Sequence, residues 1–160
     1  MSANPASKSQ PVSALPPLSG KPMRQVGSTG PLVLLPNRCT GCRTCELACA
    51  FAHSEDGNLG LSRIRIHPAG PDRYVQVTCL QCVNAACVQV CPTQALVRNA
   101  DTGAVCHDEN RCVGCGLCET ACPFGHMHFA VEMRKPVKCD LCGGRPACAM
   151  FCPHEALEWR

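Results

Sequence analysis

The chain has 160 residues, of which 17 are cysteine and only 4% are aromatic, and its formal net charge is +3. So few aromatic side chains exclude a conventional aromatic-rich core, and cysteine is far above its usual share in globular proteins. The small net charge and the absence of any run of five or more basic residues argue against nucleic acid as a partner.

The N-terminal segment, residues 1–30, is rich in Ser, Pro, Gly and Ala. We predict an extension that cannot fold alone, either a flexible tail or an arm that orders against a partner subunit. It contains no apolar signal core and no Arg-Arg pair, which favours a cytoplasmic protein with reduced thiols. Export as the passenger of a tagged partner stays open. The apolar run LVLL at 32–35 is too short to span a membrane.

The folded region is predicted to cover residues 31–160 and to consist of short elements. A short strand is expected in PLVLLPNRC, at its start. Further strands are expected at 63–68, at 73–79, in the strand–turn–strand segment 93–112 with its turn at Asp101-Thr102-Gly103, at 128–133 and at 156–159. Helices are expected to begin in ELACAFAH and ETACPFG, and a proline after the last cysteine of a group is expected to end such a helix.

Sixteen of the cysteines form four groups with closely related spacing. The first group is Cys39, Cys42, Cys45 and Cys49, spaced C-x2-C-x2-C-x3-C. The second is Cys79, Cys82, Cys87 and Cys91, and the third is Cys112, Cys115, Cys118 and Cys122. The fourth is Cys139, Cys142, Cys148 and Cys152, and the last three groups end in Cys-Pro.

This spacing predicts cubane iron–sulfur clusters. A C-x2-C-x2-C loop turns three sulfurs and several backbone N–H groups inward, while the fourth cysteine points to a neighbouring cluster. Groups therefore work in pairs, and four groups supply sixteen ligands for four [4Fe–4S] clusters. Zinc sites instead use two-cysteine knuckles separated by a longer loop, and disulfides need an oxidising compartment. Both alternatives are disfavoured.

The segments CTGCRTCELACAFAH, LSRIRI and KCDLCGGRPACAMFCPHEAL resemble the iron–sulfur subunits of molybdenum and tungsten oxidoreductases, the dimethyl sulfoxide reductase-type superfamily. The resemblance covers about 31–160, and the short soluble polyferredoxin partners of aldehyde:ferredoxin oxidoreductase and carbon monoxide dehydrogenase are the most similar members. It implies an α+β, pseudo-symmetric double bacterial-ferredoxin-like fold. One module would span about 31–70 with 134–160, and the other about 71–133.

The resemblance also implies which groups share clusters: the first with the fourth, and the second with the third. Set A is Cys39, Cys42, Cys45 and Cys152; set B is Cys139, Cys142, Cys148 and Cys49; set C is Cys79, Cys82, Cys87 and Cys122; set D is Cys112, Cys115, Cys118 and Cys91. Ala50 replaces the usual proline after the fourth cysteine of the first group.

The function implied by this resemblance is to relay single electrons to or from a catalytic oxidoreductase subunit, without an active site of the chain's own. A tungsten or molybdenum pterin enzyme of the aldehyde:ferredoxin oxidoreductase type is the favoured partner, and a flavin subunit is a further candidate. Formate dehydrogenase, carbon monoxide dehydrogenase and hydrogenase stay open. The alternatives are a self-associating wire that links several catalytic subunits, and a free polyferredoxin.

Several other residues invite a functional reading that the sequence does not support. Cys106 lies outside every group and is expected to behave as a small buried apolar side chain. The six histidines are scattered and are expected on the surface or beside cluster ligands. No nucleotide-binding glycine motif and no catalytic triad or carboxylate pair occurs.

Overall fold

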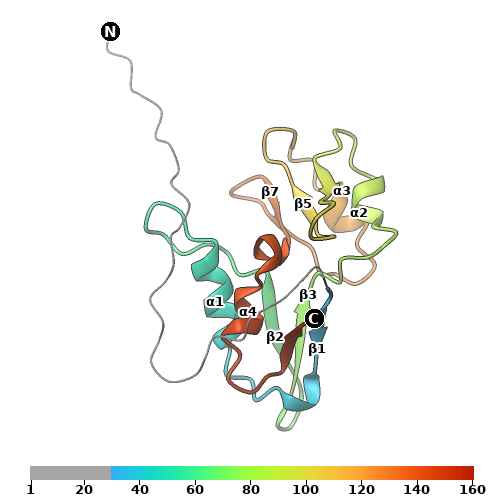
Figure 1. The fold of residues 1–160 in the computed structure, drawn as a ribbon. Helices are drawn as coiled ribbons and strands as arrows, with labels where there is room; N and C mark the ends of the chain where they lie inside the picture. The colour runs from blue at the N-terminus through green and yellow to red at the C-terminus, as the bar shows by residue number, and fades with distance from the viewer. Residues whose placement is uncertain (1–29) are drawn as a thin grey trace.

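Antiparallel two-stranded sheets account for the strands of the described residues, 30–160, in this computed structural model (Figure 1). The pairs are β1 (Leu32–Leu34) with β8 (Leu157–Trp159), β2 (Ile64–Gly70) with β3 (Arg73–Thr78), β4 (Leu96–Arg98) with β5 (Val105–His107), and β6 (His128–Ala130) with β7 (Lys135–Val137). The predicted extension at 1–30 lies, apart from Gly30, outside the described residues.

Most of the predicted strands are confirmed. The alternation at 63–68 becomes β2, in which Ile64 and Ile66 are buried and the residues between and after them are exposed. The segment 93–112 forms β4 and β5 around a turn in which Gly103 has a φ of 67°. The predicted strand at 128–133 ends early, at Ala130, because the chain turns over the next four residues.

Strand β7 was not predicted. Pro136 lies in its middle, and proline cannot donate a hydrogen bond to a neighbouring strand, so it argues against a strand in a sequence. The strand forms because its sheet has only two members, and Pro136 faces Phe129 across a single pairing. Proline has no N–H group, and none is needed on the side of β7 that has no neighbouring strand.

Each cysteine group contains a short helix near its third cysteine. The helices expected to begin in ELACAFAH and ETACPFG are present, but each begins two residues earlier than expected. The helices are α1 (Thr44–Ala52), α2 (Ala86–Gln89), α3 (Leu117–Thr120) and α4 (Ala147–Met150), and 3-10 turns cover Pro36–Arg38 (η1) and Leu141–Gly144 (η2). The three groups that end in Cys-Pro have helices of four residues, whereas α1, with Ala50 in place of proline, has nine. Residues before proline avoid the helical conformation, which explains the difference.

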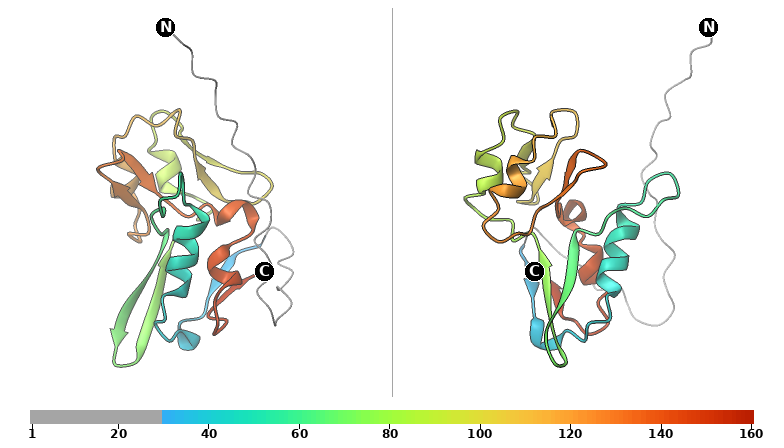
Figure 2. Two further views of the ribbon diagram at one scale, coloured as in Figure 1. Left: turned by 90° about the vertical axis from the view of Figure 1, so that its left-hand side faces the viewer. Right: turned by 180° about the vertical axis from the view of Figure 1, so that it is seen from behind.

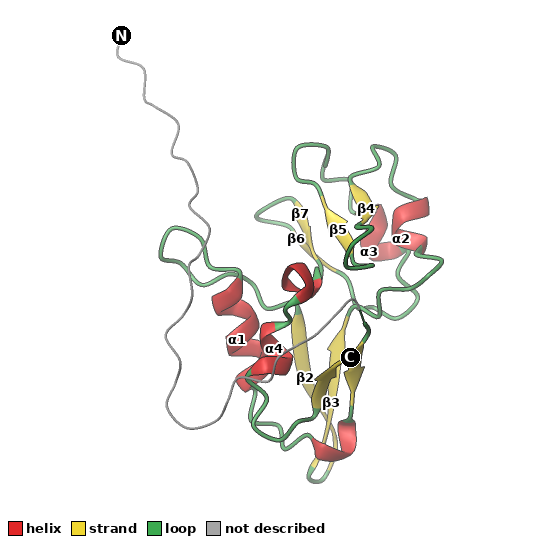
Figure 3. Cartoon of the chain, viewed as in Figure 1, coloured by secondary structure: helices red, strands yellow, loops and turns green. Residues whose placement is uncertain are grey.

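The helices pair as α1 with α4 and as α2 with α3, and the elements gather in two lobes (Figures 1 and 2). One lobe contains α1, α4 and the strand pairs β1–β8 and β2–β3; the other contains α2, α3 and β4 to β7. A view of the chain coloured by secondary structure shows that loops make up much of each lobe (Figure 3). Cysteine side chains take part in both cores, so metal sites and core occupy the same space.

The first core centres on Ile64 and Leu157 and the second on Leu96 and Val105. A third cluster, of Ala104, Cys139 and Leu141 with partly buried side chains from both lobes, joins them. Half-buried Cys106 packs into this joint as a small apolar side chain, with its Sγ 3.9 Å from the carbonyl oxygen of Ala104.

The predicted module limits fall within hairpins. The limit near 70 lies at the turn between β2 and β3, and the limit near 134 lies at the turn between β6 and β7. Within residues 30–160, no helix is long and apolar enough to cross a membrane.

Candidate metal centres

The loops that present the cysteines share one backbone feature. The residue two positions after the first cysteine of each group has a positive φ: 74° at Gly41, 52° at Gln81, 68° at Gly114 and 57° at Leu141. This left-handed conformation costs a residue other than glycine about 1–2 kcal/mol. Its repetition shows that all four loops make the same tight turn, which brings the first and second cysteines to one side.

Set A lies around a hollow in the first lobe. Cys39, Cys42, Cys45 and Cys152 line it, together with Ile66, Gln76 and Leu157. Burial raises the pKa of Cys45 to about 12, and the neighbouring Cys152 and Cys39 add to the rise. The structure thus brings thiols from the two ends of the folded region together.

Set D lies around a corresponding hollow in the second lobe, lined by Cys91, Cys112, Cys115 and Cys118 and by Leu96, His107 and Phe129. Burial raises the pKa of Cys118 to about 11, and Cys115 and Cys112 raise it further. The exposed surface inside both hollows is almost entirely apolar, although polar residues such as Gln76 and His107 also line them.

Set B is the most buried. Burial raises the pKa of Cys148 far above its ordinary value, and Cys139, Cys49 and Cys142 raise it further. Burial also raises the pKa of Cys142 to about 11, with Cys49 and Cys139 among the neighbours that add to it. The sulfurs of this set therefore lie close enough for each negative charge to oppose the next.

Set C lies where the second lobe meets the joint. Burial raises the pKa of Cys87; Lys138 opposes the rise, while Cys79 and Cys122 add to it. Cys82, Cys87 and Cys122 pack against the second core, and Cys79 packs against the joint.

The fourth cysteine of three groups accepts a backbone hydrogen bond on its sulfur. The N–H groups of Arg63, Ala95 and Ala156 each lie 3.2 Å from the Sγ of Cys49, Cys91 and Cys152, respectively. Although burial would raise the pKa of Cys91, the side chain of Thr93 and nearby N–H groups lower it overall. These donors favour the thiolate, which is the form that binds metal.

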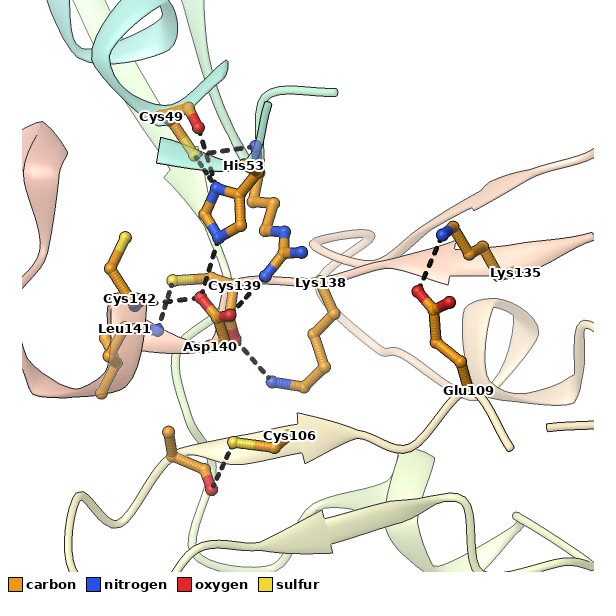
Figure 4. Close-up of polar contacts among 12 residues, drawn as sticks. Cys49, His53, Cys106, Glu109, Lys135, Lys138, Cys139, Asp140, Leu141 and Cys142 are labelled. Carbon is orange, nitrogen blue, oxygen red and sulfur yellow. Dashed lines mark hydrogen bonds and ion pairs between the residues drawn. The ribbon is translucent and has the colours of Figure 1, made fainter. Parts of the chain in front are cut away.

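A charged cluster of His53, Asp140 and Arg63 adjoins set B (Figure 4). The Nδ1 of His53 lies 2.8 Å from the carbonyl oxygen of Cys49, and its Nε2 lies 3.2 Å from Oδ1 of Asp140. Arg63 Nη1 lies 2.6 Å from the other carboxylate oxygen. Burial opposes protonation of His53, but the contacts with Asp140 and Cys49 raise its pKa to about 9. The ring therefore donates from both nitrogens.

The same carboxylate also organises the fourth loop, because Oδ1 of Asp140 accepts the N–H of Cys142 at 2.9 Å. His53, Asp140 and Cys142 lie close enough to hold a metal ion, but the Asp140 carboxylate already binds both the His53 ring and Arg63. Their arrangement fits support of a set B ligand better than a separate metal site.

Sequence reasoning did not single out three residues beside these sets, Asp140, Gln81 and Lys138, whereas His107 was among the histidines expected on the surface or beside cluster ligands. Asp140 and Lys138 flank Cys139, and Gln81 lies between two cysteines of the second group, so adjacency to a ligand was the available signal. His107 lines the set D hollow, where its Nε2 is buried without a partner among the described residues.

The four thiol sets fit iron–sulfur clusters by the chemistry of their donors. Each set consists of thiols alone, the walls around sets A and D are largely apolar, and backbone N–H groups point at sulfur. Four converging thiols cannot all ionise unless a cation offsets their charge, and iron supplies one. A buried group of thiols with this geometry defines the class of ferredoxin-like iron–sulfur proteins.

Comparison with known proteins identifies the family. Residues 72–160 match the 4Fe-4S dicluster domain and residues 36–52 match a 4Fe-4S binding domain. The chain belongs to the 4Fe-4S dicluster family of iron–sulfur electron-transfer subunits, as the resemblance in its sequence indicated. It is an electron-transfer protein of oxidoreductases and not a catalytic subunit.

Three relatives illustrate the family. The polyferredoxin-like subunit of aliphatic sulfonate oxidoreductase from Pyrococcus furiosus is 41% identical, over 78% of this chain and 72% of its own. The putative electron transport protein YsaA of Escherichia coli is 40% identical, over 76% and 83%. The thiosulfate reductase electron transfer subunit PhsB of Salmonella typhi is 36% identical, over 76% and 70%.

Proposed function

We propose that the chain holds four [4Fe–4S] clusters, one in each of sets A to D, and relays single electrons to or from a catalytic oxidoreductase subunit. A bound [4Fe–4S] cluster accepts and passes on one electron. The chain's own residues hold the iron through sixteen cysteines, exclude water with apolar walls and direct N–H groups at sulfur. The observation that carries the proposal is that Cys152 lines the same hollow as Cys39, Cys42 and Cys45.

The strands support the double ferredoxin-like arrangement. Leu34 and His107 each end a strand five positions before the first cysteine of a group, and Leu157 and Leu96 each begin a strand five positions after the last cysteine of another. Leu34 pairs with Leu157, and His107 pairs with Leu96. The strand pairs β1–β8 and β4–β5 thus have matching registers.

The same backbone hydrogen bond occurs beside each of these two strand pairs. The N–H of Leu35 donates to the carbonyl oxygen of Ala156 at 2.9 Å, and the N–H of Asp108 donates to that of Ala95 at 2.7 Å. Together with the packing of α1 on α4 and of α2 on α3, this supports two equivalent modules. The first and fourth groups would form the outer module and the second and third the inner one.

The relatives support a molybdenum or tungsten enzyme as the partner. Their names assign them to aliphatic sulfonate oxidoreductase, to thiosulfate reductase and, at 34% identity, to anaerobic dimethyl sulfoxide reductase. We favour an aldehyde:ferredoxin oxidoreductase-type catalytic subunit in the cytoplasm.

Metal analysis tests the cluster proposal. Protein purified without air should contain about 16 iron and about 16 acid-labile sulfide per chain, as four cubanes require. A protein that contains zinc and no iron would overturn the proposal. Ratios near 8 would leave only two of the sets as cluster sites.

Native anaerobic purification tests the partner. We expect a tagged chain to recover a catalytic subunit that contains tungsten or molybdenum, measured by mass spectrometry of protein and metal. Recovery of a flavin or nickel–iron enzyme would replace that partner. Recovery of the chain alone would favour a free polyferredoxin, and higher-order assemblies seen by light scattering would favour a self-associating wire.

A further inference from the structure

Lys138 is a cation buried at the joint between the lobes. The residue is only 4% exposed, and its Nζ donates to Oε1 of Gln81 at 3.2 Å. It also donates to the carbonyl oxygen of Cys139 at 3.0 Å (Figure 4). Both acceptors are neutral, and no carboxylate of the described residues forms an ion pair with it. Buried charges in proteins are ordinarily paired, so this ammonium group requires an anion that side chains do not supply.

Two of the thiol sets surround this position. Lys138 directly precedes Cys139 of set B, and Gln81 lies between Cys79 and Cys82 of set C. The Nζ of Lys138 contacts both loops, so one positive charge lies beside a cysteine loop of each set.

Gln81 holds the ammonium group in place. Its Nε2 donates to the carbonyl oxygen of Cys139 at 2.8 Å, and its Oε1 accepts the N–H of Val105 at 2.9 Å as well as Lys138. Every polar atom of the amide is used between loops of both lobes. Gln81 therefore has a left-handed φ of 52°, although the first and third groups have glycine at the equivalent position.

We propose that Lys138, oriented by Gln81, is the shared counter-charge of the clusters in sets B and C and raises their reduction potentials. This inference rests on the proposed function, because the clusters supply the missing anion. A fixed positive charge favours the more negative, reduced form of each cluster. Clusters held by sets B and C would therefore hold an electron more readily than they would without Lys138.

Redox titration followed by electron paramagnetic resonance tests the proposal in the full-length, cluster-loaded protein. Lys138→Met should lower the equilibrium constant for one-electron reduction at least tenfold, about 59 mV, at two of the four clusters. Lys138→Arg keeps the charge and should stay near the unmodified values. Gln81→Glu supplies a carboxylate to Lys138 and should lower the same two potentials.

Lys135→Met is the matched control. It removes the same charge three positions earlier, from β7, which ends just before Lys138, but Lys135 lies in a surface ion pair, 2.7 Å from Glu109. We expect shifts well below tenfold. Unchanged potentials in Lys138→Met, or an equal shift of all four, would overturn the proposal.

Cluster content provides an independent readout if a variant assembles poorly. Iron lost in Lys138→Met but kept in Lys138→Arg would support a requirement for charge. Equal iron loss in both would overturn it, because the site would then depend on shape. The iron content of the unmodified protein tests the proposed function separately.

Discussion

The Nε2 atom of His53 and the Oδ1 atom of Asp140 lie 3.2 Å apart, although 87 positions separate the two residues in the chain. His53 follows α1 of the first cysteine group, and Asp140 lies inside the fourth. Their contact therefore fastens together the two groups that we propose to share sets A and B. This contact joins the two groups through side chains, in addition to the proposed connection through shared clusters.

We expect Asp140→Asn to weaken that link. The change leaves His53 and Arg63 without their anion, and breaking a partly buried charge pair is costly. Loss of visible cluster absorbance on heating should become about tenfold faster, which corresponds to about 1.4 kcal/mol in the barrier.

Glu109→Gln is the control for this prediction. It neutralises a carboxylate whose side chain is 61% exposed in its pair with Lys135, and exposed ion pairs contribute about 0–1 kcal/mol. The rate of cluster loss should barely change. Equal rates in the two variants would contradict a special role for Asp140.

Cys152→Ser tests the ligand assignment in set A. Removing one thiol from four should displace one cluster, so iron is expected to fall from about 16 to about 12 per chain. Cys106→Ser is the matched change outside every set, and it should leave iron near 16. Similar iron contents in the two variants would show that Cys152 is not a ligand.

Gly41→Ala should damage set A by a steric route. A Cβ at this position would lie 2.6 Å from the ring of Tyr74, and the φ of 74° already disfavours alanine. Gly116→Ala imposes the same backbone cost at a φ of 73°, with no atom within 4 Å of the new Cβ. We expect larger iron loss in Gly41→Ala, measured chemically. Equal loss would mean that only the backbone conformation matters.

Ala50→Pro should disrupt α1, since proline within a helix costs about 3 kcal/mol. The residue lies inside α1, and His53 follows directly after that helix. Faster cluster loss on heating, together with reduced helical circular dichroism, is therefore expected.

The reverse change, Pro153→Ala, provides the comparison. It lies beyond the end of the short α4 and should be nearly neutral. An Ala50→Pro protein as stable as the unmodified chain would show that the longer α1 is not required.

The cysteine spacing carried most of what could be predicted. It indicated helices near the third cysteines of the first and third groups, and the family resemblance added which groups share clusters, which stays a proposal. The packing of α1 on α4 and of α2 on α3 supports it. Alternation of apolar residues identified β2 and β3 because one face of that hairpin is buried. These features depend on local pattern or on ligand chemistry, and both are visible in a sequence.

Other features depend on long-range contacts that no local pattern records. Pro136 concealed β7, because only the two-stranded sheet makes a proline acceptable there. Lys138 reads as an ordinary surface lysine until the fold buries it against Gln81. The role of Asp140 likewise needs His53 and Arg63 beside it.

The pairing of β1 with β8 has a consequence for biosynthesis. The proposed inner ligands, sets C and D, are complete once Cys122 has left the ribosome, whereas sets A and B wait until Cys152 has also emerged. Domains assemble as their residues emerge, so cofactor insertion should begin with the second and third groups and finish with the first and fourth. A chain truncated before Cys139 would be expected to load iron only in its centre.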